Sequence, residues 1–93
     1  MTDFIVICFD VCDPRRLRRV SNELENFGTR VQKSIFECHL DERGFIELKN
    51  RLSDHIDEQE DHVRYYRLCP KDRLIILVDG IGRVTTDVDF HLF

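Results

Sequence analysis

The stretch Phe4-Ile5-Val6-Ile7-Cys8-Phe9, followed at once by Asp10, decides the fold of this chain. A continuous run of β-branched and aromatic residues predicts a strand with apolar side chains on both faces, because a strand with one face in water alternates apolar and polar residues. The run Leu74-Ile75-Ile76-Leu77-Val78 has the same character. We therefore expect a sheet that is apolar on both faces.

Two segments show the periodicity of amphipathic helices. The first begins at Asp13-Pro14, since an aspartate side chain caps free backbone N–H groups and proline fits the first helical turn. Its apolar stripe consists of Leu17, Val20, Leu24 and Phe27. Gly28 is predicted to end this helix. Asp41 is the predicted cap of the second helix, whose apolar stripe consists of Phe45, Leu48, Leu52 and Ile56.

The other apolar segments predict strands. One extended stretch runs over Thr29–His39, with an irregular alternation that indicates a bulge. Further strands are expected over His62–Cys69 and Leu74–Val78, with a final short strand within Val84–Phe93. Short connections and right-handed crossovers favour an α+β fold of one domain over residues 1–93, namely a ferredoxin-like antiparallel sheet with two helices on one face.

Two helices cover only one face of such a sheet. The chain has no further helix for the second face, and a bare apolar sheet would aggregate. A two-fold homodimer packed sheet to sheet is the simplest arrangement that covers it.

Composition limits the class of protein. The chain has 93 residues, of which 42% are hydrophobic and 34% charged, as in ordinary folded domains. No apolar stretch approaches the roughly 18 to 20 residues that cross a bilayer, and no basic segment precedes Phe4–Phe9, so we expect a cytoplasmic protein with no membrane partner. Four cysteines lie in or beside apolar runs without a C-x-x-C pair, so we expect reduced, buried thiols rather than disulfides or zinc ligands.

Charge is unevenly distributed along the chain. The segment Pro14–Lys33 contains five arginines and one lysine against two glutamates, a local charge of +4, and the net charge of −4 leaves −8 for the rest. At about 100° per residue, Arg15, Arg18 and Arg19 point away from the apolar stripe of the first helix, and Arg16 lies at its flank. An acidic body with one basic segment suits phosphate binding on one surface, and a solvated helix face is the alternative.

Asp10 is the strongest candidate for a chemical role. It follows directly on an apolar strand, where an ionised carboxylate is costly if it is buried and unpaired, so we expect it at the open end of that strand. Aspartates at strand ends are also common turn formers, which leaves a purely structural role open.

Four segments stand in a recognisable order along the chain. They are Phe9-Asp10-Val11 with Asp13, Arg15-Arg16-Leu17-Arg18-Arg19-Val20, Gly28-Thr29-Arg30-Val31-Gln32-Lys33-Ser34-Ile35-Phe36-Glu37 and Asp61-His62-Val63-Arg64-Tyr65-Tyr66-Arg67-Leu68-Cys69. This order resembles the Cas-two family of CRISPR-associated proteins, with its aromatic-Asp strand end, Arg-rich first helix and G-x-R-V-Q-x-S-(V/I)-F-E second strand. The resemblance spans nearly the whole chain.

The resemblance implies a homodimer that acts in spacer acquisition, sits between two dimers of the Cas-one type of CRISPR integrase and holds protospacer DNA. Family members are also described as magnesium-dependent nucleases acting on RNA or DNA, which makes Asp10 the catalytic and Mg²⁺-binding residue. A two-fold axis can bring Asp10 of each subunit together, giving one Mg²⁺ two carboxylates. The adjoining position, often tyrosine in the family, is Phe9 and offers no phenolic hydroxyl.

The residues expected to bind nucleic acid lie in the helix and strand that follow Asp10. They are Arg15, Arg16, Arg18, Arg19 and Arg30 for phosphates, with Gln32 and Ser34 for neutral hydrogen bonds. Two functions stay open: an endonuclease, and a non-catalytic structural adaptor that bridges integrase dimers and holds protospacer DNA. The Arg-rich helix and the lack of a Gly-rich phosphate loop disfavour a third, a regulatory domain that binds a small molecule.

Overall fold

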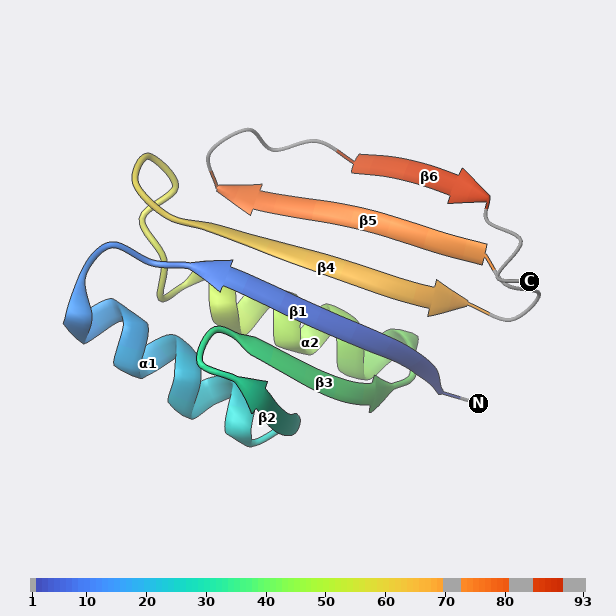
Figure 1. Cartoon of the computed structure of the whole chain (residues 1–93), viewed down its shortest axis with the longest axis horizontal. Coiled ribbons are helices and arrows are strands. Elements are labelled where there is room, and N and C mark those ends of the chain that lie inside the picture. The colour runs from blue at the N-terminus through green and yellow to red at the C-terminus, as the bar shows by residue number, and fades with distance from the viewer. Residues whose placement is uncertain (1, 70–72, 81–84, 90–93) are drawn as a thin grey trace.

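Six strands and two helices follow one another in the computed structural model (Figure 1), which describes residues 2–69, 73–80 and 85–89. In chain order they are β1 (Asp3–Asp10), α1 (Pro14–Glu25), β2 (Gly28–Gln32), β3 (Ile35–Leu40), α2 (Glu42–Ser53), β4 (His62–Cys69), β5 (Arg73–Gly80) and β6 (Thr85–Asp89).

All of these strands form one antiparallel sheet in the order β2-β3-β1-β4-β5-β6. The part β2-β3-β1-β4, with a helix after β1 and another after β3, is the ferredoxin-like arrangement, and β5 and β6 extend the sheet beyond β4. The predicted fold class is confirmed. β6 pairs with β5 of its own chain, while residues 84 and 90–93, the rest of the predicted last strand, lie outside the described residues.

The stretch predicted as one strand over Thr29–His39 is in fact a hairpin. β2 and β3 pair antiparallel, and the chain turns between them at Lys33 and Ser34. The predicted bulge is present, because the register shifts between Arg30 and Gln32.

Both helices begin where the sequence predicts. The Asp13 carboxylate accepts a hydrogen bond from the Arg16 backbone N–H at 3.0 Å, and Asp41 accepts one from the Gly44 N–H at 2.7 Å. The predicted end of α1 is wrong, because Asn26 caps it. In the described part of the chain, no helix has the length and apolar character needed to span a membrane.

Gly28 begins β2 instead of ending α1. A Cβ atom at this position would lie 2.2 Å from the carbonyl oxygen of Glu37 on the neighbouring strand β3. Glycine is therefore required here for the close approach of two backbones, which is a common reason for glycine in strands.

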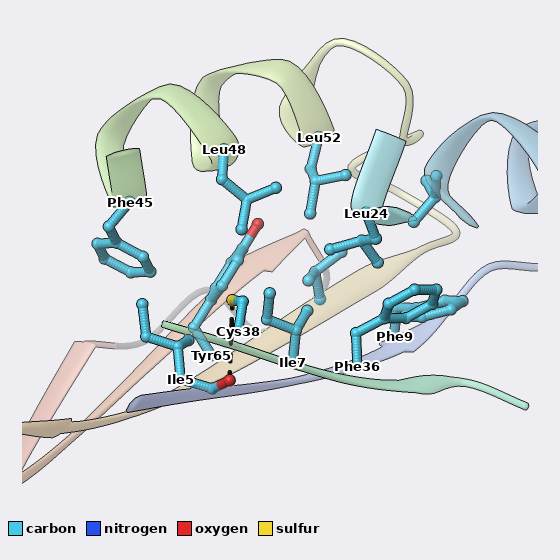
Figure 2. Packing of buried hydrophobic residues seen from close by; sticks show 12 residues of the cluster. Ile5, Ile7, Phe9, Leu24, Phe36, Cys38, Phe45, Leu48, Leu52 and Tyr65 are labelled. Atoms are coloured by element: carbon cyan, nitrogen blue, oxygen red, sulfur yellow. Dashed lines mark hydrogen bonds between the residues drawn. The ribbon is translucent and has the colours of Figure 1, made fainter. Parts of the chain in front are cut away.

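The core lies between the helices and one face of the sheet (Figure 2). Alternate residues of β1, namely Ile5, Ile7 and Phe9, are buried under α1 and α2. The rings of Phe9 and Phe36 lie 6.0 Å apart, and the Cys38 thiol donates to the Ile5 carbonyl oxygen. This arrangement fixes which residues of each strand face the helices.

The opposite face of the sheet is also apolar, and we call it the open face. Val6 pairs with Tyr66, which pairs with Ile76, and the next row consists of Phe4, Leu68 and Leu74. These side chains are only partly buried, and both described helices lie on the other face. The prediction of a second apolar face is confirmed.

The four cysteines are free thiols. Cys38 is buried, and Cys8 and Cys69 are partly buried. Cys12 is exposed in the loop after β1, so the expectation of four buried thiols is wrong at this position.

Candidate functional site at the end of β1

Asp10 is the last residue of β1, and its side chain is exposed. Its Cα partner across the sheet is His62, the first residue of β4. Alternation along β1 puts Asp10 on the open face with Val6 and Cys8. No described cation lies within ion-pair distance of its carboxylate. Asp10 therefore stands at the open end of the strand, as predicted.

An open hollow of about 440 Å³ lies at this end of the sheet. Its polar lining comes from three segments and consists of Asp10, Lys33, Ser34, His62 and Arg64. The Phe9 N–H donates to the Ser34 carbonyl oxygen at 3.1 Å, which attaches the β2–β3 turn to β1 beside Asp10. The structure therefore brings the predicted residues Asp10 and Ser34 into one hollow.

Arg64 adds a positive charge to the hollow. It is exposed and lies opposite Cys8 in the pairing of β1 with β4. Burial raises the pKa of the Cys8 thiol, and the charge of Arg64 acts in the opposite direction. Two cations, Lys33 and Arg64, thus share the hollow with one carboxylate.

The arginines of α1 divide into two groups. Arg15, Arg18 and Arg19 are exposed, as predicted, and within the described residues they have no carboxylate partner. Arg16 instead forms ion pairs with Asp61 at 2.7 Å and with Glu60 at 3.2 Å. Its guanidinium has a structural contact that the sequence did not predict.

The remaining predicted residues lie on β2 and in the turn after it. Arg30, Gln32 and Ser34 are exposed. The Arg30 guanidinium lies 5.3 Å from the ring centroid of Phe36, which is buried under the helices, so Arg30 is on the helix side of the sheet. Arg30 and the arginines of α1 do not line the hollow around Asp10.

Asp61 fixes the loop that follows Asp10. Its side chain is fully buried, yet it accepts hydrogen bonds from the backbone N–H groups of Cys12 and Asp57, each at 2.9 Å, in addition to those of Arg16. Burial by itself would raise the pKa of Asp61, but the bonds from Arg16, Asp57 and Cys12 outweigh it and lower the pKa below its usual value. The charged form therefore holds β1, α1 and the segment before β4 together.

Comparison with known proteins identifies the family. The family model described as CRISPR associated protein Cas2 matches residues 1–74. The chain belongs to the Cas2 family. It is 41% identical over 92 residues to a CRISPR-associated endoribonuclease Cas2 of Chloroflexus aurantiacus, with 99% of each chain covered. The same identity holds over 94 residues with a Cas2 endoribonuclease of Moorella thermoacetica, covering 96% of this chain and 97% of that one.

Solved structures agree with this assignment. The crystal structure of Streptococcus pyogenes Cas2 at pH 6.5 matches with a TM-score of 0.67 and 36% identity, over 73% of this chain and 88% of that one. A hypothetical protein, TT1823, from Thermus thermophilus matches with a TM-score of 0.72 and 30% identity, over 92% and 100%. The resemblance predicted from the sequence is confirmed, and the function of this Cas2 family member is CRISPR-associated.

The sequence alone does not assign Lys33, His62, Arg64 or Asp61 to the site. The alternation of β4 was a usable signal for Arg64, since a charged residue between the apolar Val63 and Tyr65 faces the opposite side of the sheet. No comparable signal existed for Asp61, because two of its three partners, Arg16 and Cys12, stand 45 or more residues away in the chain.

We predict that Asp61→Ala destabilises the fold by about 3 kcal/mol, since it leaves Arg16 and two backbone N–H groups without their acceptor. Urea unfolding measures this loss. Because the folded pKa of Asp61 is lowered, its contribution is complete above the ordinary aspartate pKa of about 3.9 and is lost as the pH falls through the folded pKa.

The matched control is Asp54→Ala, at an exposed aspartate that caps the end of α2. A surface change of this kind alters the unfolding free energy by about 0.5 kcal/mol or less. Equal losses for the two variants at neutral pH would contradict the role given to Asp61.

Proposed function

We propose that this Cas2 family member acts in spacer acquisition as a homodimeric endonuclease that cleaves phosphodiester bonds of RNA or DNA, with Mg²⁺ held by Asp10. The observation that supports this most directly is an exposed, unpaired carboxylate at the end of the central strand, in a hollow with two cations. The names of the relatives point the same way, since those of Chloroflexus aurantiacus and Moorella thermoacetica are called endoribonucleases. A Cas2 of Halalkalibacterium halodurans, 46% identical over 54 residues, with 58% of this chain and 56% of that one covered, is called an endonuclease.

The proposed dimer joins two open faces about a two-fold axis. The rows through Val6 and Phe4 place aromatic and aliphatic side chains on this face at successive cross-strand positions. Burying such a surface against its own copy removes apolar area from water without any further element from the chain. Asp10 lies at the end of β1, where this interface meets solvent.

The residues of the hollow fit Mg²⁺. This ion binds through one or two carboxylates, keeps several waters and accepts oxygens from a substrate phosphate. Among the described residues no cluster of three or more acidic, histidine or cysteine side chains forms a complete ligand cage. We assign one ligand to Asp10 and a second to the partner subunit's Asp10. When bound, Mg²⁺ neutralises charge on the phosphate and lowers the pKa of a coordinated water.

The basic residues position the polynucleotide. Arg15, Arg18 and Arg19 extend from the first turns of α1, directly after the loop that follows Asp10, and Arg30 stands on the edge strand β2. Guanidinium groups without carboxylate partners are suited to bind phosphate oxygens. Gln32, on the same strand as Arg30, and Ser34, in the turn that follows it, are exposed and can add neutral hydrogen bonds.

A second function is favoured by one observation. The exposed arginines of α1 do not line the hollow around Asp10, so they can hold protospacer DNA whether or not a bond is cut. In that case the homodimer is a structural adaptor that holds DNA between dimers of the Cas-one type of integrase. The two functions share the fold and the basic surface, and they differ in whether Asp10 is required.

We predict that Asp10→Asn lowers Mg²⁺-dependent cleavage of RNA or DNA by at least roughly a hundredfold, because the amide has no charge with which to hold the ion. Cleavage is measured on labelled oligonucleotides with Mg²⁺ or with EDTA. The control is Asp54→Asn, which removes an exposed carboxylate from the end of α2. Full activity of Asp10→Asn would exclude the nuclease mechanism, and intact spacer acquisition by an inactive variant would favour the adaptor.

We predict that Val6→Glu converts the homodimer into a folded monomer. A carboxylate in the middle of the buried interface has no partner there, which raises the dissociation constant by at least roughly a hundredfold. Analytical ultracentrifugation measures the mass, and circular dichroism measures folding. The control is Ile46→Glu, since Ile46 is half-exposed on α2 and away from the open face. A monomeric wild-type protein at micromolar concentration would refute the dimer.

We predict that the affinity for duplex DNA falls with salt, with a slope of log affinity against log salt of about −3.6. Four phosphates bound by Arg15, Arg18, Arg19 and Arg30 give this value at about −0.9 each. Fluorescence anisotropy at several salt concentrations measures it, and Arg18→Gln reduces the magnitude of the slope by about 0.9. The control Arg43→Gln changes an exposed arginine on α2 and leaves the slope unaltered. A wild-type slope near zero is incompatible with phosphate binding by these residues.

A further inference from the structure

The pairing of β1 with β4 continues through side chains beyond its last backbone pair. That last pair joins Asp10 to His62. Extended by two positions, the same register sets Cys12 opposite Glu60. There the Cys12 thiol donates to the Glu60 carbonyl oxygen at 3.1 Å, and the Cys12 N–H donates to Oδ1 of Asp61 at 2.9 Å. The chain is therefore held to the segment before β4 at a point two residues after the Asp10 carboxylate.

The carboxylate of Asp61 also holds the first turn of α1. Nε of Arg16 donates to Oδ2 of Asp61 at 2.7 Å, and Nη2 donates to Oδ1 at 3.2 Å. A two-point contact of this kind fixes the relative orientation of the two groups. Together with the N–H groups of Cys12 and Asp57, Arg16 gives each oxygen of Asp61 two hydrogen bonds. We call Cys12, Arg16, Glu60 and Asp61 the latch.

Burial distinguishes Arg16 from the other arginines of α1. The side chain of Asp61 has no exposed area, and that of Arg16 is 24% exposed. Arg15 and Arg18 are exposed, and within the described residues neither has a carboxylate partner. If Arg16 turned to a phosphate, it would leave a buried carboxylate without its counter-charge, which is costly. Arg16 is therefore suited to hold the fold at this point, whereas its neighbours are suited to bind phosphate.

A carboxylate that holds a metal ion works only within a narrow range of positions. A displacement of about 1 Å from the productive geometry can lower a rate by about a hundredfold. Asp10 is exposed at a strand end, and the latch closes on the chain just beyond it. We propose that Arg16 and Asp61 are positioning residues that hold Asp10 in place for Mg²⁺ and substrate, and that Arg16 does not bind phosphate. This inference rests on the proposed function, since it concerns the same carboxylate.

Steady-state cleavage kinetics separate positioning from phosphate binding. In Arg16→Gln and in Asp61→Asn, kcat falls roughly tenfold to a hundredfold while KM changes less than about threefold, because the substrate still binds but the carboxylate is displaced. The slope of log affinity for duplex DNA against log salt keeps its wild-type value in both variants. Loss of a phosphate contact would instead raise KM and reduce the magnitude of the slope by about 0.9, as expected for Arg15→Gln. That second pattern in Arg16→Gln would overturn the proposal.

The double variant Arg16→Gln/Asp61→Asn tests whether the two residues act as one unit. Effects within one ion-pair network are not additive, so kcat of the double variant lies within about threefold of that of the weaker single variant. Losses that multiply in the double variant would contradict a shared role.

Phe45→Leu is the control for general loss of stability. Phe45 is buried on α2 and does not belong to the latch, so this change weakens the core elsewhere. All variants are compared at a temperature at which circular dichroism shows them folded. We expect Phe45→Leu to keep the wild-type kcat. A fall in kcat equal to that of Asp61→Asn would attribute the effect to stability and overturn the positioning role.

Amide hydrogen exchange gives a readout that needs no cleavage. NMR of the protein without Mg²⁺ compares Asp61→Ala with wild type, or Asp61→Asn if the alanine variant is unfolded. Exchange of the Cys12 amide rises at least roughly tenfold more than that of the α2 amides, because the chain beside Asp10 opens locally. An equal change at Cys12 and in α2 would overturn the latch. A wild-type protein that cleaves nothing, with local opening in the variant, would remove the nuclease function and leave the latch in place.

Discussion

The pairing of β1 on both of its edges is the constraint on which the rest of the structure depends. β3 and β4 bind it on either side, and its side chains are apolar on both faces. Ile5 and Ile7 pack under the helices, while Phe4 and Val6 lie on the open face. A slip of one residue in this register would exchange the two sets. The same register places Asp10 opposite His62, at the edge of the apolar surface, where a carboxylate can be charged.

Local signals explain how much of the fold the sequence predicted. β1, α1 and α2 each have a continuous apolar run or a capped helical stripe, and all three were predicted close to their observed bounds. The β2–β3 hairpin was missed because its turn, Lys33 and Ser34, has none of the Gly, Asn or Asp residues that mark a tight turn. The helical pattern predicts a helix end at Gly28, whereas the role of this glycine depends on the neighbouring strand β3.

The site shows the same division between local and distant information. The position of Asp10 and the outward direction of Arg15, Arg18 and Arg19 follow from strand and helix periodicity, and the structure agrees with both. The engagement of Arg16 by Asp61 joins residues 45 positions apart, and the hollow is lined from four separate segments. Such contacts exist only after the sheet has assembled, so neither residue type nor spacing indicates them.

The late position of β4 has a consequence for synthesis of the chain. One edge of β1, and the buried acceptor for Arg16, are supplied by residues 61–69, so the central strand is half unpaired until about three-quarters of the protein has left the ribosome. An apolar strand with a free edge is a template for association with other chains. At usual elongation rates this interval lasts on the order of seconds, during which a nascent chain depends on its surroundings to stay soluble.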